Sequence, residues 1–149
     1  MLRLTLTRRK PIRPVKLIEP SYRRDGNAQT ITLPLLLKSR ANFRGHTRSR
    51  KHIRDIKEQR GLTCLLLRSY AKKLPLPLKL TLVRVAPRRL DAHENLPMAF
   101  KSVVDGIADW LEVDDRFGFL CRYSQEKAST PNTYGCRVTI EPADGKLPG

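Results

Sequence analysis

Acidic residues are scarce in this sequence of 149 residues, where 14 Asp and Glu stand against 30 Lys and Arg and the formal net charge is +16. Cysteine is also rare. The wide, irregular spacing of Cys64, Cys121 and Cys136 is typical of reduced, partly buried thiols and not of a zinc cluster or a disulfide framework. No apolar run approaches the length of a membrane span, and no signal-peptide pattern opens the chain, so we expect an intracellular protein.

So basic a chain needs a polyanionic partner, and nucleic acid is the commonest one. An anionic membrane surface is the alternative, but it favours a basic amphipathic helix with exposed aromatic residues, which this sequence lacks. Charge therefore favours nucleic acid and says nothing about catalysis.

The hydrophobic content of 40% is typical of a folded domain, and the length suits a single one. Alternation of side chains predicts strands at 30–38 and 78–87, and helical spacing predicts helices at 48–72 and 95–112. Two further strands, at 117–125 and 134–142, are predicted to form a hairpin. The order β-α-β-α-β-β predicts a small α+β domain with a mixed sheet and two main helices. We expect a basic, flexible arm over 1–28, the folded domain over 29–142, and a frayed tail over 143–149.

The few acids are concentrated in one stretch, because seven of the 14 fall between Asp91 and Asp115. On a helical wheel, the segment 95–112 separates an apolar from a polar face. The apolar face contains Leu96, Phe100, Val103, Val104, Ile107, Trp110 and Leu111, and the polar face Lys101, Asp105, Asp109 and Glu112. Asn95 is a suitable N-cap, and Pro97 is acceptable in the first turn.

Further acids flank this helix, with Asp91, His93 and Glu94 before it and Asp114 and Asp115 after it. The helix separates its own ends by about 25 Å at ~1.5 Å per residue, so only the fold or a second subunit can bring the two sets together. One interpretation is structural: the first set favours the helix N-terminus and the second forms a turn. The other is a metal site, because carboxylates repel DNA phosphates unless a cation such as Mg²⁺ lies between them. Lys101 would then add positive charge for the transition state.

The stretch "RRLDAHENLPMAFKSVVDGIADWLEVDD", 88–115, resembles the signature of RusA-like Holliday-junction resolvases, endodeoxyribonucleases often carried by phages and prophages. That signature has an arginine-rich strand end, Asp-x-Asp-Asn-Leu, a lysine and an Asp on the helix, and Asp-Asp. "TITLPLLLKSRANFRGH" and "PNTYGCRVTIEP" resemble the family's first strand with its loop and its closing strand. The resemblance covers about residues 30–142. It implies a mixed-sheet α+β fold, a homodimer in the cytoplasm of a bacterial or phage-infected cell, and Mg²⁺-dependent cleavage of four-way DNA junctions.

By this resemblance Glu94 and Asn95 match the Asp-Asn pair of the signature. Asp115, with Asp114 beside it, matches the Asp-Asp pair. Lys101 and Asp105 match the helical Lys and Asp. Two departures stand out: Ala92 occupies the position of the family's first Asp, and Lys101 comes about one helical turn late. The neighbours of Ala92 offer substitutes, Asp91 as an oxygen ligand of Mg²⁺ and His93 as a catalytic base or a ligand better suited to Mn²⁺ or Zn²⁺. His93 is otherwise an exposed loop histidine.

The expected metal ligands are Asp91, Glu94, Asp114 and Asp115. The expected DNA contacts are basic or polar residues near the acidic stretch and in the loop before the first helix, where they neutralise phosphates. They are Arg40, Asn42, Arg44, Arg48, Arg50, Lys51, Arg88 and Arg89. Two alternatives to a nuclease remain: a catalytically degenerate nucleic-acid-binding protein of the same fold, which Ala92 favours, and a small basic protein that binds RNA.

Overall fold

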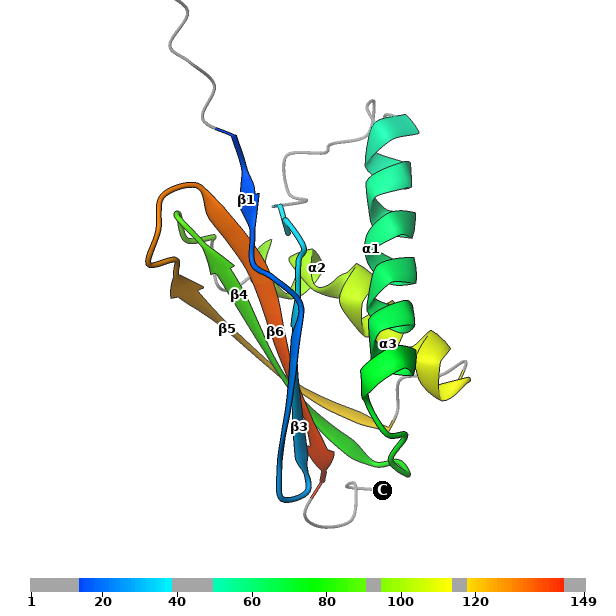
Figure 1. Ribbon diagram of the computed structural model, residues 1–149. Helices are drawn as coiled ribbons and strands as arrows, with labels where there is room; N and C mark the ends of the chain where they lie inside the picture. The colour runs from blue at the N-terminus through cyan, green and yellow to red at the C-terminus, as the bar shows by residue number, and fades with distance from the viewer. Residues whose placement is uncertain (1–13, 39–49, 91–94, 114–117, 144–149) are drawn as a thin grey trace, which may run out of the picture.

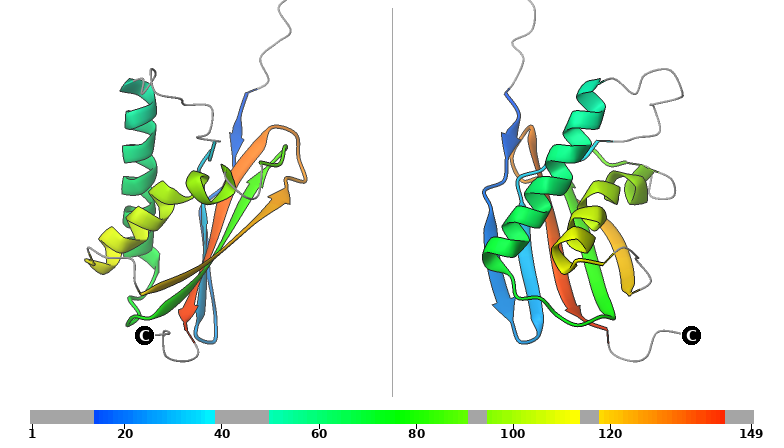
Figure 2. Two further views of the ribbon diagram at one scale, coloured as in Figure 1. Left: turned by 180° about the vertical axis from the view of Figure 1, so that it is seen from behind. Right: turned by 90° about the vertical axis from the view of Figure 1, so that its right-hand side faces the viewer.

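The protein is an α+β domain, and in the part of the chain that the structure describes three helices cover one face of a six-stranded mixed sheet (Figures 1 and 2). The computed structural model describes residues 14–38, 50–90, 95–113 and 118–143. The elements in chain order are β1 (Lys16–Leu17), β2 (Ser21–Asp25), β3 (Ala28–Leu33), α1 (Arg50–Tyr70), β4 (Leu78–Ala86), α2 (Asn95–Ala99), α3 (Lys101–Leu111), β5 (Phe119–Lys127) and β6 (Thr133–Pro142). The predicted fold class and the predicted order of the main elements are confirmed.

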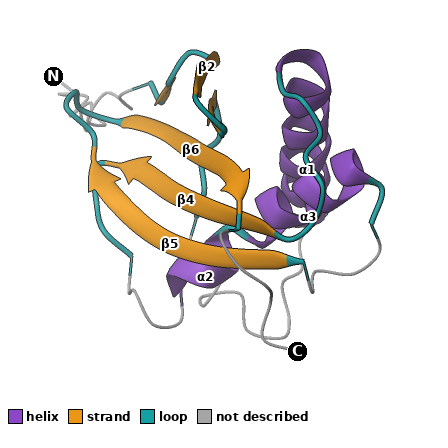
Figure 3. Ribbon diagram, turned by 90° about the horizontal axis from the view of Figure 1, so that it is seen from below, coloured by secondary structure: helices purple, strands orange, loops and turns teal. Residues whose placement is uncertain are grey.

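The strand order is β2-β3-β6-β4-β5, with β1 added in parallel to β6. β4 pairs in parallel with β5 and antiparallel with β6, so it lies between the last two strands (Figure 3). The predicted hairpin of the two closing strands is therefore wrong. Alternation of side chains identifies a strand but not its neighbours. The helices after β4 allow β5 to pair in parallel with β4 at the edge of the sheet. The other side of β4 is then open for pairing with β6.

Regular structure begins earlier than the sequence predicts, because β1 and β2 lie within the segment 1–28 that we expected to be a flexible arm. β2 pairs with β3 through a tight connection at Gly26, whose φ of +60° suits glycine. β1 fits beside β6 because Gly135 leaves room for Ile18, whose Cδ1 would lie 2.6 Å from a Cβ at that position. Residues 1–13 lie outside the described residues, and so does the predicted tail from 144 onward.

The core forms between the sheet and the helices. Leu78, Leu80 and Leu82 of β4 are fully buried, and the apolar face predicted for 95–112 packs onto them and their neighbours, with Trp110 1% exposed. Only Leu111 of that face is half-buried. Helical spacing thus predicted the buried side correctly.

The second helical segment is divided at Phe100, where we predicted one continuous helix. The Phe100 amide donates to the Pro97 carbonyl at 3.2 Å, a tight turn that ends α2 before α3 begins. The Phe100 ring stacks on Tyr123 of β5, with centroids 5.5 Å apart. The turn therefore directs a large aromatic ring into the core at the point where the helix changes course.

The three cysteines are free, as predicted from their spacing. Cys136 is buried in β6, and burial raises the pKa of its thiol. Cys64 and Cys121 are half-buried.

Candidate functional site

The predicted site residues fall into two groups. Nine of them lie outside the described residues: Arg40, Asn42, Arg44, Arg48, Asp91, His93, Glu94, Asp114 and Asp115. Among the others, Arg50, Lys51, Arg88, Arg89 and Lys101 are exposed, and Asp105 is half-buried. Asn95 begins α2. The described residues around the gaps define how the acidic and basic segments are attached to the fold.

Arg84 attaches two of these segments to β4. This arginine is 6% exposed, and it occupies an inward position that continues the alternation of Leu78, Leu80 and Leu82. Its Nε donates to the Leu37 carbonyl and its Nη1 to the Arg88 carbonyl, both at 2.8 Å. Desolvation lowers the pKa of the guanidinium. One buried cation thus holds the described end of the arginine-rich loop beside the chain that leads into the first acidic segment.

A second polar clamp follows directly. The Gln125 side chain of β5 accepts a hydrogen bond from the Leu90 amide and donates one to the Leu90 carbonyl, both at 2.8 Å. A side-chain amide that pairs with both groups of one residue imitates a neighbouring strand. It fixes the chain immediately before Asp91 near the carboxyl end of β5.

The second acidic segment is attached at the other end of the sheet. The Gly118 carbonyl accepts a hydrogen bond from the Leu78 amide at 2.7 Å, where β4 and β5 both begin. Gln125 comes seven positions after Gly118 along the extended chain, a distance of about 23 Å at ~3.3 Å per residue. In one copy of the chain, Leu90 and Gly118 lie near opposite ends of β5.

The predicted helical lysine lies between these ends. Lys101 borders a shallow hollow of about 510 Å³ between the helices and the edge strand β5. The hollow is lined by Pro97, Met98, Lys101, Val104, Phe119, Cys121 and Tyr123. Lys101 is the only charged residue that lines the hollow among the described residues, and within them it makes no ion pair.

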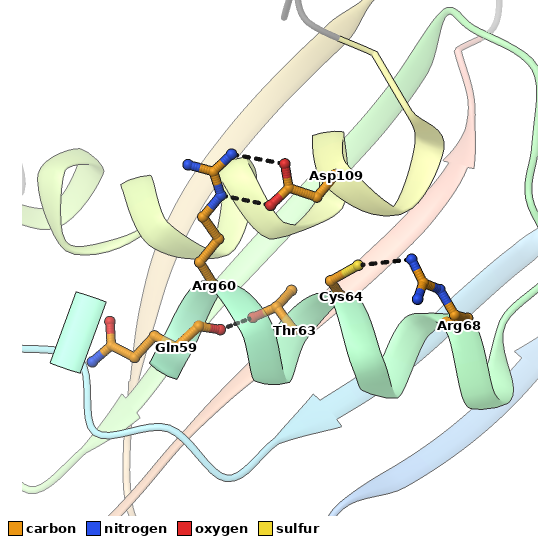
Figure 4. A network of polar contacts seen from close by, with 6 residues as sticks. All are labelled: Gln59, Arg60, Thr63, Cys64, Arg68 and Asp109. Atoms are coloured by element: carbon orange, nitrogen blue, oxygen red, sulfur yellow. Dashed lines mark hydrogen bonds and ion pairs between the residues drawn. The ribbon is translucent and has the colours of Figure 1, made fainter. Parts of the chain in front are cut away.

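Asp109 has a structural role that the sequence did not reveal. Both of its carboxylate oxygens accept from Arg60 of α1, with Nη2 at 2.7 Å and Nε at 2.5 Å (Figure 4). This hydrogen bonding lowers the pKa of the Asp109 carboxyl and raises the pKa of Arg60. At the next turn Glu112 lies 3.8 Å from Lys73. Two of the seven clustered acids therefore pair with bases of α1 and of the chain that follows it.

Close packing of the two helices requires Gly106. A Cβ at this position would lie 2.6 Å from the Arg60 carbonyl oxygen and 2.8 Å from the Thr63 Cβ. Beside this contact the Ser102 hydroxyl donates to the Gln59 Oε1 at 2.7 Å, while Gln59 Nε2 donates to the Leu36 carbonyl at 3.2 Å. Of the polar face predicted for 95–112, Asp109 is directed toward α1, where it pairs with Arg60.

A groove of about 300 Å³ lies on the other side of α1, between this helix and the segment that follows β3. His52, Asp55 and Glu58 line it together with Lys38. Within the described residues, however, no group of three His, Cys, Asp or Glu side chains is arranged to hold a metal ion. All four expected metal ligands, Asp91, Glu94, Asp114 and Asp115, lie outside the described residues.

No protein-family model matches this chain, and no curated protein matches it either. Among the described residues, no helix is both long and apolar enough to cross a membrane.

Proposed function

We propose that the chain is a divalent-metal-dependent endonuclease that cuts branched DNA, as its resemblance to RusA-like Holliday-junction resolvases implies. The observation that carries the proposal is the separation of charge along the sequence. The net charge is +16, yet half of the acids fall between Asp91 and Asp115. Basic surroundings attract DNA, whereas a cluster of carboxylates can approach a phosphate only across a cation.

The attachment of the basic and acidic segments supports this proposal. Because Arg84 of β4 binds both Leu37 and Arg88, the chain before the loop expected to contact DNA and the chain before the segment expected to hold metal are held by the same side chain. Arg88 and Arg89 are exposed there and can neutralise phosphates next to the site of cleavage.

Carboxylates are the donors that Mg²⁺ and Mn²⁺ prefer, so Asp91, Glu94, Asp114 and Asp115 would hold the ion. When bound, the ion stabilises the negative charge that develops on the phosphate and lowers the pKa of a bound water. Lys101 would contribute a further positive charge beside the substrate.

A homodimer is part of the proposal for a geometric reason. Leu90 and Gly118, the described neighbours of the two acidic segments, are held near opposite ends of β5 in one chain. The strand is rigid and cannot fold back to join them. A second copy, packed so that its first acidic segment approaches the second segment of its partner, completes the site.

A nucleic-acid-binding protein that descends from such a nuclease is the second candidate. It is favoured by Ala92, which provides no ligand where the resolvase signature has its first Asp. This candidate predicts binding of four-way junctions without metal-dependent products.

The Asp115→Asn variant separates the two candidates. We expect it to abolish Mg²⁺-dependent cleavage of a labelled four-way junction and to leave binding of the junction in EDTA unchanged. Asp109→Asn is the matched control, because it removes an acid from the same stretch that pairs with Arg60 instead, and it should retain cleavage. Undiminished cleavage by Asp115→Asn would refute the assignment, and a wild-type protein that binds but never cuts would establish the second candidate.

A further inference from the structure

α1 carries a line of positive charge along the side that faces away from the sheet. At 3.6 residues per turn, positions 50, 54, 57, 61, 65 and 68 follow one another on a single side of the helix. They hold Arg50, Arg54, Lys57, Gly61, Leu65 and Arg68, and all six are exposed. The four basic residues among them, Arg50, Arg54, Lys57 and Arg68, are called the α1 stripe below.

The α1 stripe lies opposite the buried side of the helix, where Thr63 and Leu67 pack against the core. In Figure 2, α1 lies on the helical side of the domain, in front of the sheet in the right-hand view. None of the four bases makes an ion pair with another described residue, whereas Arg60, on the flank of the same helix, is paired with Asp109. Their charges are therefore available to a partner.

The placement of these charges costs helix stability. The first turn of α1 contains no acidic residue and begins with Arg50 and Lys51, so cations stand at the positive end of the helix dipole. Both acids of α1, Asp55 and Glu58, line the groove between α1 and the segment after β3, and Glu58 is also exposed one turn after Arg54. Such an arrangement is unfavourable for the isolated helix and favourable for a bound polyanion.

We propose that the α1 stripe binds the phosphate backbone of double-stranded nucleic acid. The stripe extends over about 27 Å at ~1.5 Å per residue, and a duplex presents one negative charge per about 1.7 Å of its axis. It contains no aromatic side chain on which the bases of a single strand would stack. Leu65 is the only apolar side chain among the six exposed positions on this side of α1, too little for insertion into a membrane surface. A straight, rigid row of cations fits the backbone of a rigid duplex.

Duplex binding by the α1 stripe extends the proposed function. It rests on that function only for the identity of the natural substrate, branched DNA. The stripe would hold a duplex arm of the branched DNA, away from the acidic segments. Except for Arg50, its residues were not among the DNA contacts predicted from the sequence. In a sequence so rich in Lys and Arg, the spacing of the bases at positions 54, 57 and 68 does not stand out. It becomes recognisable only when the structure shows which side of α1 is buried.

The test is binding of a labelled, unbranched 20-base-pair duplex in EDTA, measured by fluorescence anisotropy over a series of salt concentrations. The triple variant Arg54→Gln/Lys57→Gln/Arg68→Gln removes three charges and keeps good helix formers. Each phosphate contact contributes about 0.9 to the slope of log Kd against log salt, so the slope should fall by about 2 to 3. Affinity at ~0.1 M salt should fall at least tenfold.

The control variant Lys16→Gln/Arg23→Gln/Arg122→Gln removes the same charge from exposed positions on β1, β2 and β5. It should keep the wild-type slope and change Kd less than about threefold. A double variant, Arg54→Gln/Lys57→Gln, gives the same answer at two thirds of the size if the triple variant unfolds, as circular dichroism would reveal.

An unchanged salt slope in the stripe variants overturns the proposal, and so does an equal loss in both sets. Loss of binding to a single strand or to anionic vesicles without loss of duplex binding overturns it as well. Cleavage of a four-way junction is measured in parallel. If the wild-type protein never cuts the junction but the stripe variant loses duplex affinity, the proposed nuclease function is contradicted and duplex binding by the α1 stripe is supported. If the wild-type protein cuts the junction but the stripe variant keeps its duplex affinity, only duplex binding by the α1 stripe is contradicted.

Discussion

The guanidinium of Arg84 in β4 donates a hydrogen bond to the main-chain carbonyl of Leu37, 47 positions away in the sequence, at 2.8 Å. The Nη1 of the same guanidinium donates to the Arg88 carbonyl. A buried arginine that satisfies two loop carbonyls acts as a fixed anchor, because an unpaired carbonyl buried with it is costly. The anchor determines where the arginine-rich loop and the first acidic segment leave the sheet.

Replacing Arg84 with Met should therefore destabilise the fold. The buried Leu37 carbonyl and the part-buried Arg88 carbonyl lose their partner, and we expect the free energy of unfolding to fall by about 2–4 kcal/mol. Urea unfolding measures the loss. The matched Arg122→Met variant, exposed on β5, should change stability by less than about 0.5 kcal/mol. Equal effects of the two substitutions would contradict the anchoring role.

The two glycines of the helical layer should respond in opposite ways to alanine. Gly106→Ala places a methyl group 2.6 Å from the Arg60 carbonyl oxygen, so α1 and α3 must move apart at a cost of about 1–3 kcal/mol. Gly61→Ala meets no atom within 4 Å and should stabilise α1 by about 0.5–1 kcal/mol. Thermal unfolding of both variants measures the difference, and a stabilised Gly106→Ala variant would contradict the close packing of the helices.

The Asp109–Arg60 pair predicts a pH dependence of stability. Hydrogen bonding to Arg60 lowers the pKa of Asp109 in the folded state, so its contribution is present above the unfolded pKa, about 4, and is lost as the pH falls through the folded value. Both partners are well exposed, and we expect only about 0.5 kcal/mol from the pair. Wild type should exceed Asp109→Asn in stability at pH 7, and the difference should disappear near pH 2.

Urea titrations at the two pH values measure this difference. Asp25→Asn is the control, because Asp25 is exposed in β2 and makes no ion pair with a described residue. A difference between wild type and Asp109→Asn that grows on acidification would have the wrong sign for a carboxylate stabilised by a cation.

Mixing of two inactive variants tests whether the site spans two copies of the chain. Glu94→Gln and Asp115→Asn should each abolish junction cleavage. In a mixed dimer, one of the two sites would combine an intact Glu94 from one chain with an intact Asp115 from the other, so the mixture should recover up to about a quarter of wild-type activity. The Asp115→Asn protein alone at the same total concentration is the control. No recovery after confirmed subunit exchange would mean that both acids act within one chain.

Much of the fold followed from the sequence. The alternation of Leu78, Leu80 and Leu82 and the spacing of Val103, Ile107 and Trp110 identified the buried sides of β4 and α3, because one face of each element packs on the core. The exposed β2 has no such pattern and was missed.

What the sequence could not predict depends on contacts between distant residues. The insertion of β4 between β5 and β6, the pairing of Arg60 with Asp109 and the clamp of Gln125 on Leu90 join positions 35 or more apart. The break at Phe100 is local, but it accompanies the stacking of the Phe100 ring on Tyr123 of β5, a contact with another element that the sequence does not show. Arg84 was visible only as an interruption of an apolar strand. For the acidic segments, the prediction of a metal site remains a prediction, since Glu94 and Asp115 lie outside the described residues.

The central claim is that this basic chain uses its clustered acids to cut branched DNA with a divalent metal ion. The most direct measurement incubates the wild-type protein with a labelled four-way junction, a duplex and single strands of the same sequence, each with Mg²⁺, Mn²⁺ or EDTA. We expect paired nicks in the junction with either metal ion, little cleavage of the duplex or the single strands, and no product in EDTA. Junction binding with no metal-dependent product, or equal cleavage in EDTA, would contradict the claim.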